Sequence, residues 1–317
     1  MTVKTGLNPK QSVRLKSHAR GITRRQLLGL FAASGGAALL SACGETGTPS
    51  IPNPLSALAS PVFEGYSIFH ETMAEMVWPA IKQAAQDGAI ILLPVGIIEE
   101  HGPHIGLASD IYQSYYWTKL TRRALQARGI TALITPPMYW GMSDMVRGYP
   151  GTFSVSDSTM KSLIYDMHAS LASWGFKTVF GFNLHGDAFH NHIYQEAIQQ
   201  AHNQLGLDAY YVYPQGTYVL DEKLAVFLKD VATPESIRKH TDAHAGALET
   251  AEMAVFFPHN VNLDVAKTLK PSTSFEPLGY WGDPASYDQI KVEDIKSMGD
   301  AIIAATVKAI EAVLKDK

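Results

Sequence analysis

The sequence predicts an α/β protein in which helices cover both faces of a mainly parallel central sheet, a three-layer α/β/α arrangement. Short apolar segments alternate with helix-length segments along the chain. The apolar segments are rich in β-branched and aromatic residues and are apolar on both alternating faces, as strands covered by helices on both sides require. Alternation of this spacing is typical of parallel strands joined by right-handed crossovers.

Four strands and five helices are expected. The strands are predicted at 89–96, 130–136, 177–183 and 208–214, and the helices at 69–86, 110–127, 157–173, 189–204 and 291–315. In a sheet of this kind, functional groups gather at the carboxyl ends of the strands. Polar clusters follow the first and the third predicted strands, so we expect the functional site at that edge of the sheet.

The first 43 residues have the pattern of an export signal. Residues 1–42 hold seven of the 26 Lys and Arg residues and none of the 30 Asp and Glu residues. Arg24 and Arg25 precede a short apolar stretch, which resembles a twin-arginine signal, and "LSAC" at 40–43 resembles a lipobox. We therefore expect export to the periplasm or cell surface and a membrane anchor on lipidated Cys43. The alternative is a basic leader or a cleaved signal without a lipid.

The remaining chain divides into a linker and one folded domain. Residues 44–61 are rich in Pro, Gly, Ser and Thr, which predicts a flexible tether, and the domain is expected to span 62–317. Without residues 1–42 the net charge is 19 − 30 = −11. An acidic body repels phosphate backbones, so nucleic acid is excluded as a partner. Cys43 is the only cysteine, so no intramolecular disulfide can form.

The first polar cluster, "GIIEEHGPHIGLASD" at 96–110, offers Glu99, His101 and Asp110, with His104 nearby. A Glu-x-His pair in extended chain places both side chains on one face, and an aspartate at the start of a helix can turn back toward them. Mixed imidazole and carboxylate ligands suit Zn, Mn or Fe. The alternative is an acidic capping turn with a surface histidine.

The second cluster follows the third strand and the third precedes a helix. His185 and Asp187 flank Gly186, whose missing side chain permits close approach of the backbone to a substrate. Asp187 could instead be only the N-cap of the next helix. His190 and His192 are interpreted as surface or packing histidines. In the third cluster, His244 and Glu249 have the residue types of a general acid/base, against the alternative of a solvated helix start.

Five sequence strings occur in an order that resembles the creatininase family, also called creatinine amidohydrolases. They cover most of the chain from Ile90 to Pro284 and read "LPVGIIEEHGPHIGLASD", "GMSDMVRGYPGTFSVS", "GFNLHGD", "HAGALET" and "GYWGDPAS". The resemblance implies a creatininase-like three-layer fold and two divalent ions per subunit, Zn or Mn, with Fe as a further candidate. It also implies a homo-oligomer, a hexamer in the family.

The resemblance also implies roles for individual residues. One ion would be bound by Glu99, Asp110 and His185, and the other by His101, Asp110 and Asp187, with Asp110 bridging. The remaining implied roles are catalysis by His244 and Glu249 and substrate binding by Ser143. Two positions depart from the family pattern. Asp187 is one methylene shorter than the glutamate of creatininase, and Val146 stands where relatives often have a histidine, which argues against creatinine itself as the substrate.

These observations predict a metal-dependent hydrolase that cleaves a carbon–nitrogen amide bond of a small substrate, with cyclic amides among the candidates. The two ions would activate a water and polarise the substrate carbonyl. Two alternatives stay open: the same centre acting on a non-amide cyclic substrate such as a lactone or keto-sugar, and a non-catalytic metal-binding surface lipoprotein.

Overall fold

The structure is a computed structural model that describes residues 67–213, 220–228, 231–240 and 242–316. The described residues all fall in the compact unit that begins at Phe63. The predicted signal at 1–43 and the predicted linker at 44–61 lie outside the described residues. No helix in the described part of the chain is both long and apolar enough to span a bilayer.

A five-stranded parallel sheet forms the centre of the domain. Its strands lie in the order β2-β1-β3-β4-β5. They comprise β1 (Ile90–Val95), β2 (Ala132–Ile134), β3 (Thr178–Asn183), β4 (Asp208–Tyr213) and β5 (Ala225–Phe227). All four pairings are parallel. The first four strands lie inside the predicted ranges, whereas β5 was not predicted.

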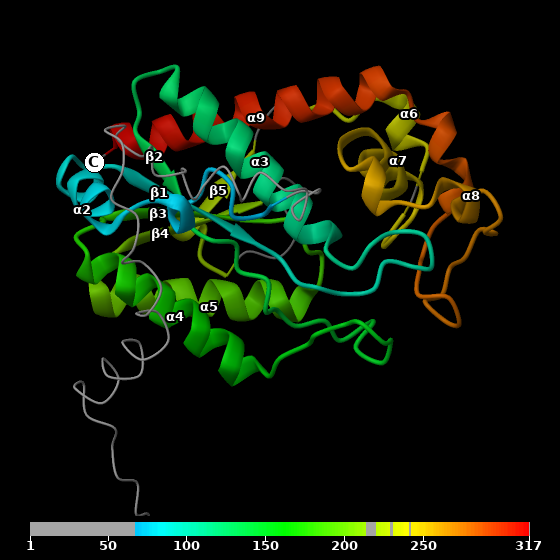
Figure 1. Ribbon diagram of the computed structural model, residues 1–317, viewed down its shortest axis with the longest axis horizontal. Coiled ribbons are helices and arrows are strands. Elements are labelled where there is room, and N and C mark those ends of the chain that lie inside the picture. Colours follow the sequence, from blue (N-terminus) through cyan, green and yellow to red (C-terminus); the bar gives the residue numbers. More distant parts are fainter. Residues whose placement is uncertain (1–66, 214–219, 229–230, 241, 317) are drawn as a thin grey trace, which may run out of the picture. The chain divides into compact units, whose positions relative to one another are not determined.

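Helices cover both faces of this sheet, which confirms the predicted three-layer fold. Figure 1 shows α3 (Ser109–Gln126) and α9 (Val292–Lys315) on one face, and α4 (Asp157–Ser173) and α5 (Ala188–Leu205) on the other. Alternate β1 side chains enter two separate cores: Ile91 belongs to the core under α4 and α5, and Leu92 to the core under α3 and α9. Each fully buried side chain of this size contributes about 1.5–3 kcal/mol, so the strands are held firmly on both sides.

The predicted helix at 69–86 is shorter in the structure. A 3₁₀ turn, η2 (Met73–Glu75), comes first, and α2 (Trp78–Gln86) begins only at Trp78. Pro79 lies in the first turn of α2, where its missing N–H costs nothing. The backbone at Val77 is extended, as expected for the N-cap residue that precedes a helix.

The chain between β5 and α9 builds a smaller group of helices. They are α6 (Glu235–Arg238), α7 (Ala247–Phe256) and α8 (Leu263–Ala266), with the 3₁₀ segments η4 (Pro258–Asn260) and η5 (Pro284–Gln289). A further 3₁₀ turn, η3 (Glu222–Leu224), precedes β5. Helices α6 to α8 lie close together in Figure 1, and two small apolar cores join this group to α3 and α9.

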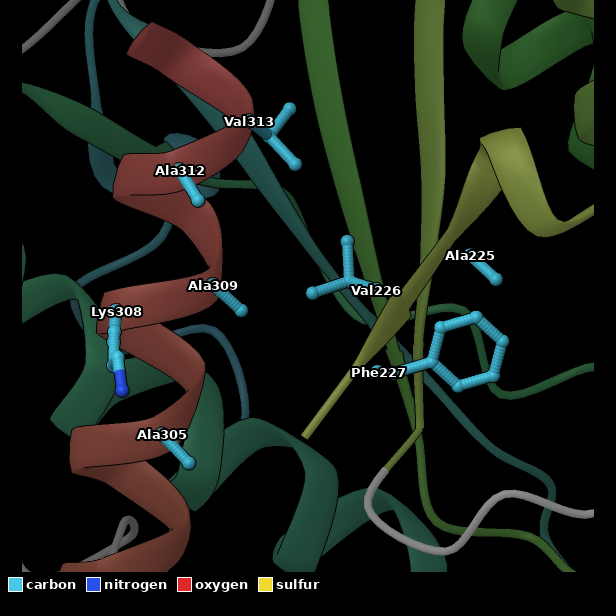
Figure 2. Close-up of a pocket in the computed structure, with 8 residues that line it drawn as sticks. All are labelled: Ala225, Val226, Phe227, Ala305, Lys308, Ala309, Ala312 and Val313. Carbon is cyan, nitrogen blue, oxygen red and sulfur yellow. The ribbon is translucent and has the colours of Figure 1, made fainter. Parts of the chain in front are cut away.

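A pocket of about 310 Å³ lies between β5 and α9 (Figure 2). Its lining is mostly apolar, from Ala225, Val226 and Phe227 on the strand and from alanines and Val313 on the helix, with Lys308 at its side. None of the predicted site residues lines it. The candidate functional residues therefore lie elsewhere, in the loops that follow the strands.

Candidate metal centre

The register of the sheet brings two of the polar clusters together. Val95, the last residue of β1, is paired with Asn183, the last residue of β3. The loops that leave these two strands therefore start side by side, one leading to Glu99 and the other to His185. The first loop returns at α3, whose first turn carries Asp110.

Glu99, Asp110 and His185 form one group of ligand atoms. The Nδ1 atom of His185 lies 3.0 Å from Oε1 of Glu99 and 3.1 Å from Oδ2 of Asp110. The opposite ring nitrogen, Nε2, lies 3.1 Å from the main-chain oxygen of Met142. Because this Nε2 donates a proton to the carbonyl, Nδ1 is left as the atom for a cation.

His101 approaches the same aspartate from the other side. Its Nε2 atom lies 3.2 Å from Oδ1 of Asp110, and its Nδ1 lies 3.1 Å from the main-chain oxygen of Glu99. The carbonyl again orients the ring and leaves one nitrogen directed at the centre. Each oxygen of Asp110 thus faces a different histidine.

The carboxylates of the centre raise the pKa values of its two histidines. Burial lowers the pKa of His101, but the charge of Asp110 and its hydrogen bond outweigh this effect and raise the pKa to about 10. Burial also opposes protonation of His185, yet Glu99 and Asp110 raise its pKa well above the ordinary value. Histidine ligands must be neutral, so cation binding is expected to displace these protons.

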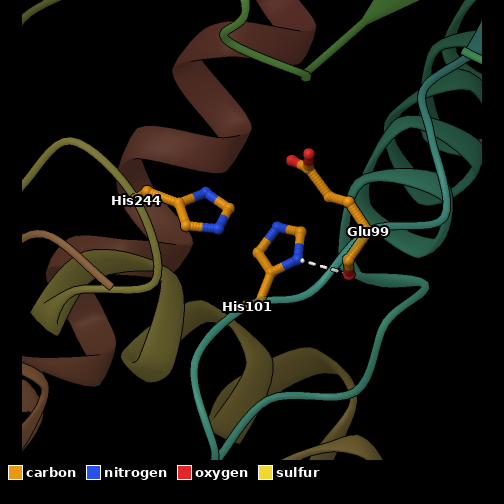
Figure 3. A group of neighbouring side chains, drawn as sticks. All are labelled: Glu99, His101 and His244. Carbon is orange, nitrogen blue, oxygen red and sulfur yellow. Dashed lines mark hydrogen bonds between the residues drawn. The ribbon is translucent and has the colours of Figure 1, made fainter. Parts of the chain in front are cut away.

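A second group of candidate ligands is made by Glu99, His101 and His244, which converge in Figure 3. His244 lies just before α7, and its ring centroid is 4.5 Å from that of His101. Its Nε2 atom lies 2.8 Å from the main-chain oxygen of Glu100 and 3.6 Å from Oε1 of the same residue. The predicted proton-transfer residue therefore lies at the edge of the centre, in contact with one of its ligands.

Glu249 holds the backbone turn that follows His244. Ala245 has a φ of 50°, a left-handed conformation that is unfavourable for a residue with a side chain. Its N–H donates to Oε2 of Glu249, four residues along. Glu249, which was predicted to act with His244, therefore stabilises this turn in the structure, and Glu249 is only partly buried.

Asp187 is outside both groups of candidate ligands in the described residues. Its Oδ1 accepts the N–H groups of Phe189 and His190, and its Oδ2 accepts the N–H of Asp144 at 3.1 Å. These are the contacts of the N-cap of α5, the alternative that the sequence left open.

The two residues predicted to bind substrate differ in exposure. Ser143 is fully buried, and its hydroxyl has no hydrogen-bond partner among the described residues. Gly186 is exposed, and a side chain built there would meet nothing within 4 Å. Open space beside Gly186 leaves room for a bound molecule, whereas Ser143 lies in the interior.

His190 is a packing residue, one of the two interpretations that the sequence left open. It is fully buried, its ring centroid lies 4.9 Å from that of His185, and its Nδ1 accepts the N–H of Met142 at 3.4 Å. The carbonyl of the same Met142 orients His185. His190 therefore supports a ligand from behind, and helical spacing alone could not show which face of α5 was buried.

The donor set fits divalent cations. Two carboxylates and two imidazoles are buried together, and Oε2 of Glu99 has no hydrogen-bond partner among the described residues. A buried carboxylate oxygen without a donor is costly unless a cation compensates it. The fold and this site together define the class of protein: an α/β protein with a candidate metal centre at the carboxyl ends of its strands.

Comparison with known proteins specifies this class further. Residues 74–313 match the family described as "Creatininase: Creatinine amidohydrolase", and the chain belongs to this creatininase family. A creatinine amidohydrolase of Pseudomonas putida is 27% identical over 226 residues, covering 67% of this chain and 82% of the relative. A mycofactocin precursor peptide peptidase of Mycolicibacterium smegmatis is 26% identical over 246 residues, covering 67% and 84%.

Solved structures share the fold at lower identity. A crystal structure of creatinine amidohydrolase has a TM-score of 0.54 and 21% identity, covering 78% of this chain and 97% of that chain. A structure named "Creatininase Mn" has a TM-score of 0.53 and 21% identity, covering 78% and 98%. A mutant creatininase of the "Zn-Zn type" has a TM-score of 0.54 and 19% identity, with the same coverage. The names of the last two structures state Mn and Zn, and all three neighbours support the α/β assignment.

Proposed function

We propose that this protein is a metal-dependent hydrolase of carbon–nitrogen amide bonds, including peptide bonds in small substrates. The relatives support this proposal through the bond that they hydrolyse. An amidohydrolase and peptide peptidases both add water across a C–N amide bond, and both kinds of protein are similar to this chain over about two thirds of its length.

The observation that carries the proposal is the position of Asp110 between His101 and His185. One carboxylate that is 4% exposed presents its two oxygens to two imidazoles, at 3.2 and 3.1 Å. We assign one cation to Glu99, Asp110 and His185, and a second, more weakly bound cation to His101 and Asp110. Divalent cations in such a site supply Lewis-acid polarisation of a carbonyl and activation of a water.

His244 is assigned the proton transfer to the leaving nitrogen. Burial and the charge of His101 lower its pKa, but the hydrogen bond to Glu100 and the nearby carboxylates outweigh them, and its pKa is raised from the ordinary value. A histidine that carries a proton near neutral pH can deliver it to an amine. Glu249 is a positioning residue for His244, because it holds the strained turn at Ala245.

The test compares metal-loaded and chelator-treated protein on matched substrates. We expect the Zn- or Mn-loaded protein to release amine from N-acetyl amino acid amides or dipeptides, and the chelated protein to release none. His244→Gln is expected to keep its metal content and to lose 10²- to 10⁴-fold in kcat, the usual contribution of a general acid. Hydrolysis of lactones without hydrolysis of any amide, or amide hydrolysis that survives chelation, would contradict the proposal.

The metal content of His244→Gln shows whether His244 is a proton donor or a metal ligand. If His244→Gln loses a bound ion together with its activity, the residue is a ligand of the second cation, and the proton-transfer assignment is wrong. Creatinine belongs in the substrate panel as a compound that we expect the protein not to hydrolyse. Val146, which stands where relatives often have a histidine, is 1% exposed and contributes no polar group.

A further inference from the structure

An aromatic row leads away from His244 toward the surface. The ring of Phe275 lies 5.9 Å from the ring of His244, and the ring of Trp281 lies 5.5 Å from that of Phe275. His244 is 7% exposed, Phe275 is partly buried and Trp281 is 37% exposed. The row therefore begins at the centre and ends in solvent.

The backbone places Trp281 on the same side as His244. The two residues form an isolated antiparallel bridge, with hydrogen bonds in both directions, at 3.1 Å from His244 N to Trp281 O and 2.9 Å from Trp281 N to His244 O. Directly opposed residues of an antiparallel pair project their side chains from the same face. Because His244 points at the centre, Trp281 lies beside the approach to it.

The loop that carries the two aromatic residues is closed and anchored. Ser272 and Gly282 exchange two main-chain hydrogen bonds, at 2.8 and 3.0 Å, and so join the ends of the loop. The hydroxyl of Tyr149 donates to the main-chain oxygen of Phe275 at 2.7 Å. A loop whose backbone is held in this way loses little freedom when a ligand packs against it.

The neighbour of Trp281 shows what a purely structural aromatic residue looks like in this loop. Tyr280 projects from the opposite face, is 3% exposed and donates its hydroxyl to the main-chain oxygen of Lys270 at 2.7 Å. Trp281 leaves more than a third of its surface in water. An exposed tryptophan next to a catalytic group is a surface that is available for a ligand.

We propose that Trp281 and Phe275 form a specificity subsite for a planar aromatic group of the substrate. The inference rests on the proposed function: the scissile amide would lie at the metal centre, and an aromatic side chain or ring next to it would pack against Trp281. The subsite determines which amides are accepted and takes no part in the chemical step.

The test measures binding and does not need turnover. Phenylacetohydroxamate and acetohydroxamate share a metal-binding group and differ by one phenyl ring, so the ratio of their Kd values on the metal-loaded protein reports the subsite. We expect the aromatic probe to bind about tenfold more tightly, as aromatic contacts of this kind allow. Trp281→Ala is expected to reduce the ratio to about twofold or less.

Two further variants keep the test decisive. Trp281→Leu retains an apolar side chain without the ring and should also lose the preference. Trp174→Ala removes a tryptophan of similar exposure, 51%, from the end of α4 and should keep it. A ratio near one in the unmodified protein, or a tenfold ratio that survives both Trp281 variants, would overturn the subsite. Failure to hydrolyse amides would refute the proposed function while leaving this ratio unchanged.

Discussion

Replacing Asp110 by asparagine is the sharpest perturbation of the candidate metal centre. The carboxylate offers one oxygen to the side of His101 and the other to the side of His185, at 3.2 and 3.1 Å. An asparagine has only one oxygen, so its NH₂ group must face one of the two histidines, and an NH₂ group cannot bind a cation. Asp110→Asn is therefore expected to lose at least one ion per chain.

The ion that remains should also be bound less tightly. The substitution removes a negative charge from both ligand sets, and the loss of an outer-shell partner alone costs about 10- to 100-fold in metal affinity. We expect a weakening of about 100-fold or more for a residue that is itself a ligand. The assay is elemental analysis of protein equilibrated with Zn²⁺ or Mn²⁺, together with competition against a chelator of known affinity.

Asp187→Asn is the matched control. Asp187 is buried to a similar extent, 2% against 4% exposed, and the substitution makes the same change of charge. Asparagine is a good N-cap, but its NH₂ group cannot accept the N–H of Asp144, so this variant should keep its metal and lose about 1 kcal/mol of stability with that hydrogen bond. If Asp110→Asn binds two ions as tightly as the unmodified protein, the bridging geometry is refuted. If Asp187→Asn also loses an ion, Asp187 is a ligand and not only a cap.

Three further predictions concern stability and the support of the site. Tyr194→Phe should raise the free energy of unfolding by about 1 kcal/mol in urea denaturation, because the buried Tyr194 hydroxyl has no hydrogen-bond partner among the described residues; a destabilised variant would show that the hydroxyl is satisfied. Burial lowers the pKa of His168 below 6.5. The unfolded chain therefore binds the proton first, and stability should be complete above this pH and fall below it by up to about 1.4 kcal/mol per pH unit. The His168→Gln variant should lack this extra dependence of stability on pH. Equal slopes in the variant and the unmodified protein would contradict the assignment. Gly279→Ala should lower kcat and stability together. Gly279 has a φ of 72°, and an added Cβ would collide with Oε2 of Glu100, whose main-chain oxygen contacts His244. Unchanged kinetics would show that the contact between Glu100 and His244 does not matter.

The sequence by itself determined the fold class and the location of the site. Apolar segments such as 89–96 and 177–183 have both faces apolar because helices cover both, and this requirement is visible in a local pattern. The polar clusters that follow them were predicted to meet because the carboxyl ends of parallel strands share an edge. The spacing of Glu99, His101 and Asp110 could be interpreted for the same reason: these residues are close in the chain as well as in space.

Only the tertiary structure decided which side chains reach the centre and which support it. The pairing of Val95 with Asn183 brings two loops together, and no local pattern specifies a register between strands that are more than eighty residues apart in the chain. Asp187 and His190 have residue types that suit a metal site, yet one caps α5 and the other packs behind His185. The position of Trp281 beside His244 depends on a single backbone bridge. Such contacts are set by how elements pack, and the periodicity of a sequence describes each element only one at a time.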